Sequence, residues 1–104
     1  MEGVIEEYIV KLVQATRPGG VNASPVANQF IDVGASPRAT LALGVAARAH
    51  AFLIGGRGYV TPDDVKAVAR DVLRHRLLVN YEAEADGIGS DEVIAKLLDS
   101  VRTP

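Results

Sequence analysis

The residue with the clearest potential for binding chemistry is Arg38, in the run Gly34-Ala35-Ser36-Pro37-Arg38. Ser36 is typical of a helix cap and Pro37 of a first helical position, so Arg38 is predicted to lie in the first turn of a helix. The helix dipole disfavours a cation there by roughly a few tenths of a kcal/mol. Free N–H groups at a helix start and a guanidinium both bind phosphate oxygens. On the residues alone, two interpretations stay open: an anion site and an ordinary solvated arginine.

Two further segments have the composition of nucleotide-site motifs without their pattern. Gly55-Gly56-Arg57-Gly58 is followed by Tyr59 and Val60, so it lacks the lysine and hydroxyl of a phosphate-binding loop. Asp91-Glu92 follows Gly89-Ser90 in place of an apolar strand, and is predicted to open a helix. We therefore expect no catalytic residue in this chain.

Composition excludes several classes of function. The net charge is −2 and the pI is about 5.6, so no global basic field favours nucleic acid as a partner. There is no cysteine, and His50 and His75 are the only histidines, so no metal site is expected. The longest apolar stretch, 41–54, is interrupted by Arg48 and His50 and is shorter than the roughly 20 residues of a membrane span. The N-terminus lacks a secretory pattern, and we expect a cytoplasmic protein.

The elements that must position these residues are helices. A length of 104 residues predicts one domain, 1–104. Apolar spacing and start signals predict four helices: about 2–16, 39–54 opened by Ser36, one opened by Thr61, and 90–101 capped by Ser90. Residues 18–35 are predicted to be a long loop, in which Phe30–Val33 is either a short strand or a segment laid over the core. Residues 77–81 are predicted to be extended. The fold class is therefore all-α, a small four-helix bundle with a long loop after the first helix.

Burial can also be predicted from the pattern. Residues 39–54 are apolar on nearly every side, so this helix is expected to be central and mostly surrounded. Tyr8 and Ile9 belong to the apolar stripe of the first helix and are expected to pack in the core. His50 is expected to be partly buried and hydrogen-bonded. A basic face in the third helix is expected to be solvated; its members are Lys66, Arg70 and Arg74.

Three blocks of sequence resemble the C-terminal lid domain of MoxR-family AAA+ ATPases. Ala15-Thr16-Arg17 is similar to the end of the family's first lid helix, and Gly34-Ala35-Ser36-Pro37-Arg38-Ala39 resembles its sensor 2 segment. The third block is in two parts, residues 58–65 and 72–77. The blocks occur in order and cover nearly the whole chain. The resemblance favours the anion-site interpretation of Arg38.

The resemblance implies a role in ATP hydrolysis without a complete enzyme. In such ATPases the nucleotide lies between an α/β core and the lid, so Arg38, with Ser36 and Pro37 beside it, would meet the γ-phosphate of ATP-Mg²⁺. Tyr8 and Ile9 lie where first-helix residues can contact the adenine. The phosphate loop and acidic strand are absent from this sequence, so the chain alone should not hydrolyse ATP or bind it tightly. The implied partners are an ATPase core and the neighbouring subunits of a ring, which the resemblance implies is a hexamer. The resemblance also implies an unknown client in chaperone-like protein assembly or metal-cofactor insertion.

Two interpretations from other classes stay open. A nucleic-acid-binding helix-turn-helix is opposed by the length of the turn from Gly55 to Thr61 and by Asp63 and Asp64 at the start of the following helix. A stand-alone protein-interaction module that uses the loop 18–35 is compatible with the sequence.

Overall fold

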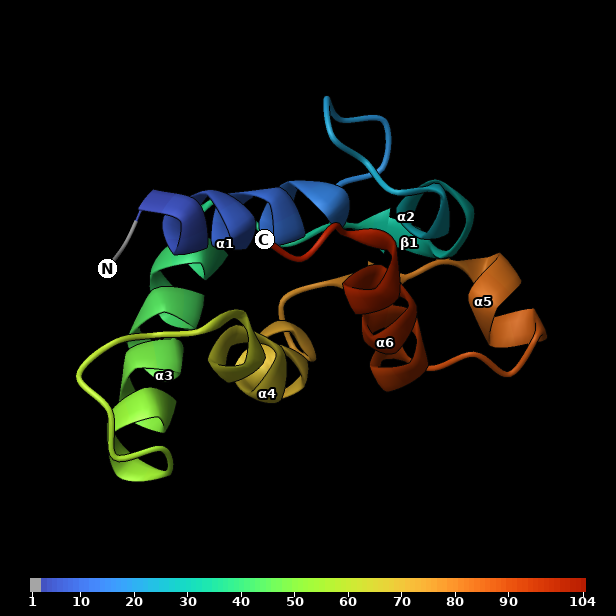
Figure 1. Ribbon diagram of the computed structural model, residues 1–104. Helices are drawn as coiled ribbons and strands as arrows, with labels where there is room; N and C mark the ends of the chain where they lie inside the picture. Colours follow the sequence, from blue (N-terminus) through green and yellow to red (C-terminus); the bar gives the residue numbers. More distant parts are fainter. Residues whose placement is uncertain (1–2) are drawn as a thin grey trace.

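The computed structural model describes residues 3–104 and shows four main helices with a small two-stranded sheet (Figure 1). The main helices are α1 (Gly3–Ala15), α3 (Arg38–Leu53), α4 (Pro62–Leu73) and α6 (Ser90–Ser100). They agree with the four predicted helices, although residue 2, predicted as the start of the first, lies outside the described part of the chain. The all-α, four-helix fold class is confirmed.

The region predicted as a long loop contains regular structure. After a turn, α2 (Pro25–Phe30) and β1 (Ile31–Val33) precede α3. The hydroxyl of Ser24 accepts a hydrogen bond from the N–H of Ala27, and Pro25 occupies the first turn, so α2 has the cap and proline typical of a helix start. The prediction of a loop was wrong here, because six residues are too few for an apolar period to be recognised.

A two-stranded antiparallel sheet joins this region to the C-terminal half. β2 (Leu78–Val79) pairs with β1, with Ile31 opposite Val79 and Val33 opposite Leu78. The extended segment predicted at 77–81 is confirmed up to residue 80, whereas Tyr81 is helical. Of Phe30–Val33, for which a strand was one of two alternatives, residues Ile31–Val33 form a strand and Phe30 ends α2. Next comes a short helix that the sequence did not predict, α5 (Tyr81–Ala85), capped by the side chain of Asn80.

The core lies where α1, α4 and α6 meet. Their inward stripes include Ile9 and Leu12 of α1, Val65 and Leu73 of α4, and Ile94 of α6, all nearly inaccessible to solvent. Tyr8 is buried with them, so the prediction that Tyr8 and Ile9 are core residues is confirmed.

Helix α3 is not central. It packs chiefly against α4 and lies at one end of a molecule that is 43 Å long (Figure 1). Its buried residues form a single stripe, Ala39, Leu43, Ala47 and Ala51, whereas Leu41 and Phe52 on the opposite side are 73% and 70% exposed. The prediction of a surrounded helix was wrong for this chain, because nothing within residues 3–104 covers the second apolar face.

Two predicted caps were also wrong. Pro37 is the N-cap of α3, and the side chain of Ser36 does not cap it; the Ser36 carbonyl accepts from the N–H of Ala39 at 2.9 Å. Gly89 is the N-cap of α6, and Ser90 is its first residue. The third cap was right: Thr61 precedes α4 and forms a capping box with Asp64.

Candidate functional site

The predicted site residues lie together at the N-terminus of α3. Ser36, Pro37 and Arg38 are all exposed, and α3 begins at Arg38. No side chain caps this helix start, and no ion pair involves Arg38 within residues 3–104. Arg38 is therefore a cation in the first turn of a helix, at the positive end of the dipole, without a paired carboxylate in the described residues. This arrangement suits an anion that comes from outside the domain.

The segment that carries Arg38 is fixed to the end of α1. The Thr16 hydroxyl donates to the carbonyl of Val13 at 2.6 Å and accepts from the N–H of Ala35 at 2.9 Å. Thr16 is completely buried. Gly34 passes so close that a Cβ atom there would overlap the carbonyl oxygen of Thr16. These contacts determine where the first turn of α3, and hence Arg38, is placed.

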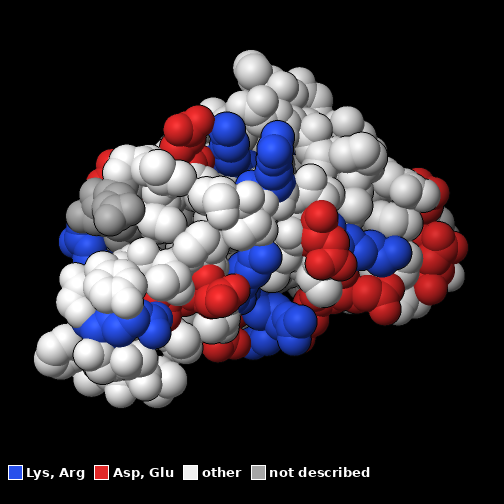
Figure 2. All heavy atoms as spheres, viewed as in Figure 1, with Lys and Arg blue, Asp and Glu red and all other residues white. Residues whose placement is uncertain are grey.

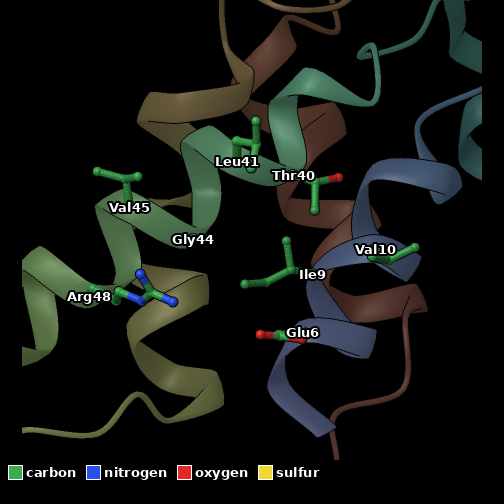
Figure 3. A pocket seen from close by; sticks show the side chains of 8 residues that line it. All are labelled: Glu6, Ile9, Val10, Thr40, Leu41, Gly44, Val45 and Arg48. Carbon is green, nitrogen blue, oxygen red and sulfur yellow. The ribbon is translucent and has the colours of Figure 1, made fainter. Parts of the chain in front are cut away.

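A hollow of about 270 Å³ lies beside this helix start, between α1 and α3 (Figure 3). Its walls are mainly apolar, with Glu6 and Arg48 as its charged residues. The full lining is Glu6, Ile9, Val10, Thr40, Leu41, Gly44, Val45 and Arg48. Ile9 thus forms part of the wall, but Tyr8 does not. Gly44 contributes no side chain, which leaves the hollow open at the middle of α3 (Figure 3).

The start of α4 holds a buried carboxylate. Asp64 is 1% exposed, and its oxygens accept from His50 Nδ1 at 2.8 Å, from Arg57 Nη2 at 2.6 and 2.7 Å, and from the Thr61 N–H at 2.8 Å. Burial alone would raise the pKa of Asp64, but these hydrogen bonds outweigh it and hold the pKa well below its usual range. His50 is partly buried and hydrogen-bonded, as predicted. This cluster ties the end of α3 and the following loop to α4.

The basic face predicted on α4 is partly neutralised. Arg74 donates to Asp91 at 2.7 Å and to Asp71 at 3.2 Å, and the hydrogen bond from Arg74 lowers the pKa of Asp91. Arg74 therefore joins α4 to α6 and is not a free cation. On the face shown in Figure 2, basic and acidic side chains are interspersed, so this face offers no continuous basic surface to a nucleic-acid backbone.

Neither metal ligands nor a membrane span is found in the described part of the chain. Within residues 3–104, no cluster of three or more His, Cys, Asp or Glu side chains could hold a metal ion. None of the described helices combines the length and apolar character needed to cross a bilayer.

The family of this fold follows from comparison with known proteins. The family model described as the AAA lid domain matches residues 24–97, more than half of the chain and including the Arg38 segment. The chain belongs to the AAA lid domain family. The structure also resembles a crystal structure of a protein from Cytophaga hutchinsonii, with a TM-score of 0.84 and 39% identity over 99% of this chain and 31% of that one.

Two of the curated relatives are MoxR proteins. The chain is 46% identical over 99 residues to Chaperone MoxR1 of Mycobacterium tuberculosis, covering 94% of this chain and 26% of that protein. It is 36% identical over 109 residues to Protein MoxR of Methylorubrum extorquens, covering 99% and 31%. The lid therefore spans about a quarter to a third of these relatives and matches a MoxR-type AAA ATPase without its core, as the sequence predicted.

Several residues that shape this lid were not recognised from the sequence as positioning residues. Thr16 and Gly34 lie in the blocks that resemble the family, but only the structure shows that they contact each other. The sequence placed Asp64 only at the start of a helix, yet it is the centre of a buried cluster. An available signal was the spacing Thr61-Pro62-Asp63-Asp64, which places Asp64 at the third helical position of a capping box.

Proposed function

We propose that this chain is the nucleotide-sensing lid of a longer MoxR-type AAA ATPase and that Arg38 contacts the γ-phosphate of ATP-Mg²⁺ held by the ATPase core. The observation that supports the proposal is the exposed guanidinium at the start of α3, without an ion pair in the described domain and on a segment fixed to α1 by Thr16. Ser36 and Pro37 form the turn from which it projects.

The electrostatics of this helix start favour a polyphosphate. A guanidinium beside the positive end of a helix dipole stabilises negative charge, and does so more strongly once a closing lid excludes water. Loss of the γ-phosphate on hydrolysis removes that attraction. The lid then separates from the core, so that hydrolysis is coupled to lid movement.

The partners of the lid follow from this role. The lid faces its own ATPase core and, in a ring oligomer, which we take to be hexameric, the neighbouring subunits. Movement of the lid would drive chaperone-like assembly of a client protein or insertion of a metal cofactor. Support for the chaperone role comes from the relative named Chaperone MoxR1, to which the chain is 46% identical.

Calorimetric titration of ATP and ADP into the full-length ATPase, with steady-state hydrolysis measured alongside, tests the role of Arg38. We expect Arg38→Ala to lower ATP affinity or turnover at least tenfold, equivalent to about 1.4 kcal/mol, and to affect ADP binding less because ADP lacks the γ-phosphate. Arg76→Ala removes an exposed cation from another part of the lid and serves as a charge-matched control. Unchanged ATP binding and turnover in Arg38→Ala would show that Arg38 is only a surface residue.

A further inference from the structure

The outer face of α3 is an exposed apolar surface with a regular pattern. Leu41, Val45 and Phe52 are 73%, 68% and 70% exposed. Their spacing of four and seven residues places them on one side of the helix, opposite the stripe that packs on α4. Arg48 occupies the remaining position of the same stripe. Side chains at this spacing are typical of a helix surface that packs against another helix.

Two hollows meet along this stripe. The hollow between α1 and α3 ends at Arg48, and a second hollow, of about 220 Å³, begins at Arg48 and extends to Tyr59 in the loop before α4. We call the two together the α3 groove. The stripe from Leu41 to Phe52 is about 17 Å long at 1.5 Å per residue, the length of some three helical turns.

The middle of the α3 groove has features that indicate close packing of another chain. Gly44 lies within a helix, where glycine costs about 1 kcal/mol relative to alanine, and it lines the hollow where a side chain would fill it (Figure 3). Arg48 is exposed and forms no ion pair within residues 3–104. The charged residues of this hollow are Glu6 and Arg48. An occupant of complementary charge would therefore carry a carboxylate opposite Arg48, between apolar residues on either side, and a cation or hydrogen-bond donor opposite Glu6.

We propose that the α3 groove receives an amphipathic helix of the ATPase core that this lid serves, with an apolar face and a carboxylate that pairs with Arg48. This inference rests on the proposed function. Arg38 begins the helix whose next turn carries Leu41, so a core that brings ATP to Arg38 also lies beside the start of the groove. The MoxR relatives are three to four times as long as this chain, so a protein of their length would contain polypeptide outside the lid that could form such a helix.

A second copy of the lid fits the groove less well. In a two-fold pair the same stripe occurs on both partners. If two α3 helices crossed near the middle of the stripe, Arg48 of one copy would approach Arg48 of the other, and the like charges would repel. A helix with a carboxylate at that position avoids this repulsion.

Cysteine accessibility tests the proposal directly, because this chain contains no cysteine. Val45→Cys and Phe52→Cys are made in the 104-residue chain and in full-length ATPase whose other cysteines are replaced, and the rate of thiol modification is measured in both. We expect both thiols to react at least tenfold more slowly in the full-length protein. Glu84→Cys, exposed on α5, is the control and should react at similar rates in both. Equal rates at positions 45 and 52 in the two proteins would overturn the proposal.

The charge of the occupant is tested in the same assay. Adding Arg48→Glu to full-length Val45→Cys should raise the rate of modification at least threefold, whereas Arg48→Lys should keep most of the protection. No effect of Arg48→Glu would overturn the assigned carboxylate. Protection that appears in the 104-residue chain and grows with its concentration would identify a second copy as the occupant.

The groove and the nucleotide sensor can fail separately. A loss of ATP affinity in Arg38→Ala with freely reactive thiols at positions 45 and 52 would leave the sensor role standing and overturn the groove. Protected thiols together with unchanged ATP binding in Arg38→Ala would support the groove and overturn the sensor role.

Discussion

The starts of α3 and α4 are two helix N-termini of the same domain with opposite electrostatic design. At α4, the carboxylate of Asp64 suits the helix dipole, is buried, and accepts hydrogen bonds from three other residues. At α3, the cation of Arg38 opposes the dipole, is exposed, and has no ion pair within the described residues. The first arrangement stabilises the fold, whereas the second leaves free the group that we propose for ATP binding. On that proposal, the residue placed against its local field is the better guide to function.

The largest effect on stability is expected at the start of α4. Asp64→Ala leaves Arg57 and His50 without their shared acceptor, so the free energy of unfolding should fall by about 3 kcal/mol, as for other broken buried ion pairs. Urea unfolding followed by circular dichroism measures this change. Asp63→Ala removes an exposed carboxylate from the same helix turn and should change stability by less than about 1 kcal/mol. Similar losses in the two variants would mean that the Asp64 cluster contributes no more than a surface acid.

The connection between α1 and the Arg38 segment is the next test. Gly34→Ala would place a methyl group against the carbonyl of Thr16, a backbone group that cannot rotate away. We expect a loss of about 2 kcal/mol, in the range found for overpacked sites. Gly58→Ala is the matched control, since a Cβ atom there meets nothing within 4 Å and Gly58 lies outside the helices and strands. Thermal unfolding of both variants decides whether this contact is as tight as the structure shows.

The pH dependence of stability sharpens the comparison further. The pKa of Asp64 is lower in the folded state than in the unfolded state, so the unfolded state takes up a proton first as the pH falls. The contribution of Asp64 is therefore complete well above pH 4 and is lost progressively below it, with a slope of at most about 1.4 kcal/mol per pH unit.

Asp64→Asn should remove the part of the stability loss at low pH that comes from protonation of Asp64. Urea unfolding of the wild-type chain and of Asp64→Asn between pH 7 and pH 3 measures the difference, with Asp63→Asn as the control. Parallel pH profiles for the wild type and Asp64→Asn would contradict the low pKa of Asp64.

The sequence was sufficient to predict helices α3 and α4, but not the residues that pack around their N-termini. The start of α4 was predictable because Thr61, Pro62 and the acids after them are local signals. The burial of Asp64 was not, since it depends on Arg57 and on His50, which is fourteen residues away on another helix. Local sequence records the cap but not the partners that approach from elsewhere in the fold.

For helix α3 the error was in the other direction, because the sequence predicted more burial than the structure shows. Its composition predicted a surrounded helix, yet one face is open in this chain. The apolar pattern reports all the surfaces that a helix is built to cover, including those supplied by polypeptide outside the domain. The pattern predicted that residues such as Leu41 and Phe52 would be covered, whereas the structure shows them exposed. The proposal of the α3 groove rests on this difference. The Arg38 assignment likewise needed the family resemblance, because a single exposed arginine is chemically ambiguous.

The smallest effect on stability is expected at the start of α3. If Arg38 opposes the dipole of α3 and contacts nothing in the lid, removing its charge should not weaken the fold. We expect Arg38→Gln to change the free energy of unfolding by less than about 0.5 kcal/mol, and Arg38→Glu to raise it by about 0.3–1 kcal/mol, because an acid suits a helix start. Urea unfolding at low ionic strength measures both variants, and added salt should reduce the gain. A clear loss of stability in either variant would place Arg38 among the structural residues of the lid. The predicted pattern, a more stable lid with weaker ATP binding in the full-length protein, is that of a side chain retained for binding against a small cost in folding.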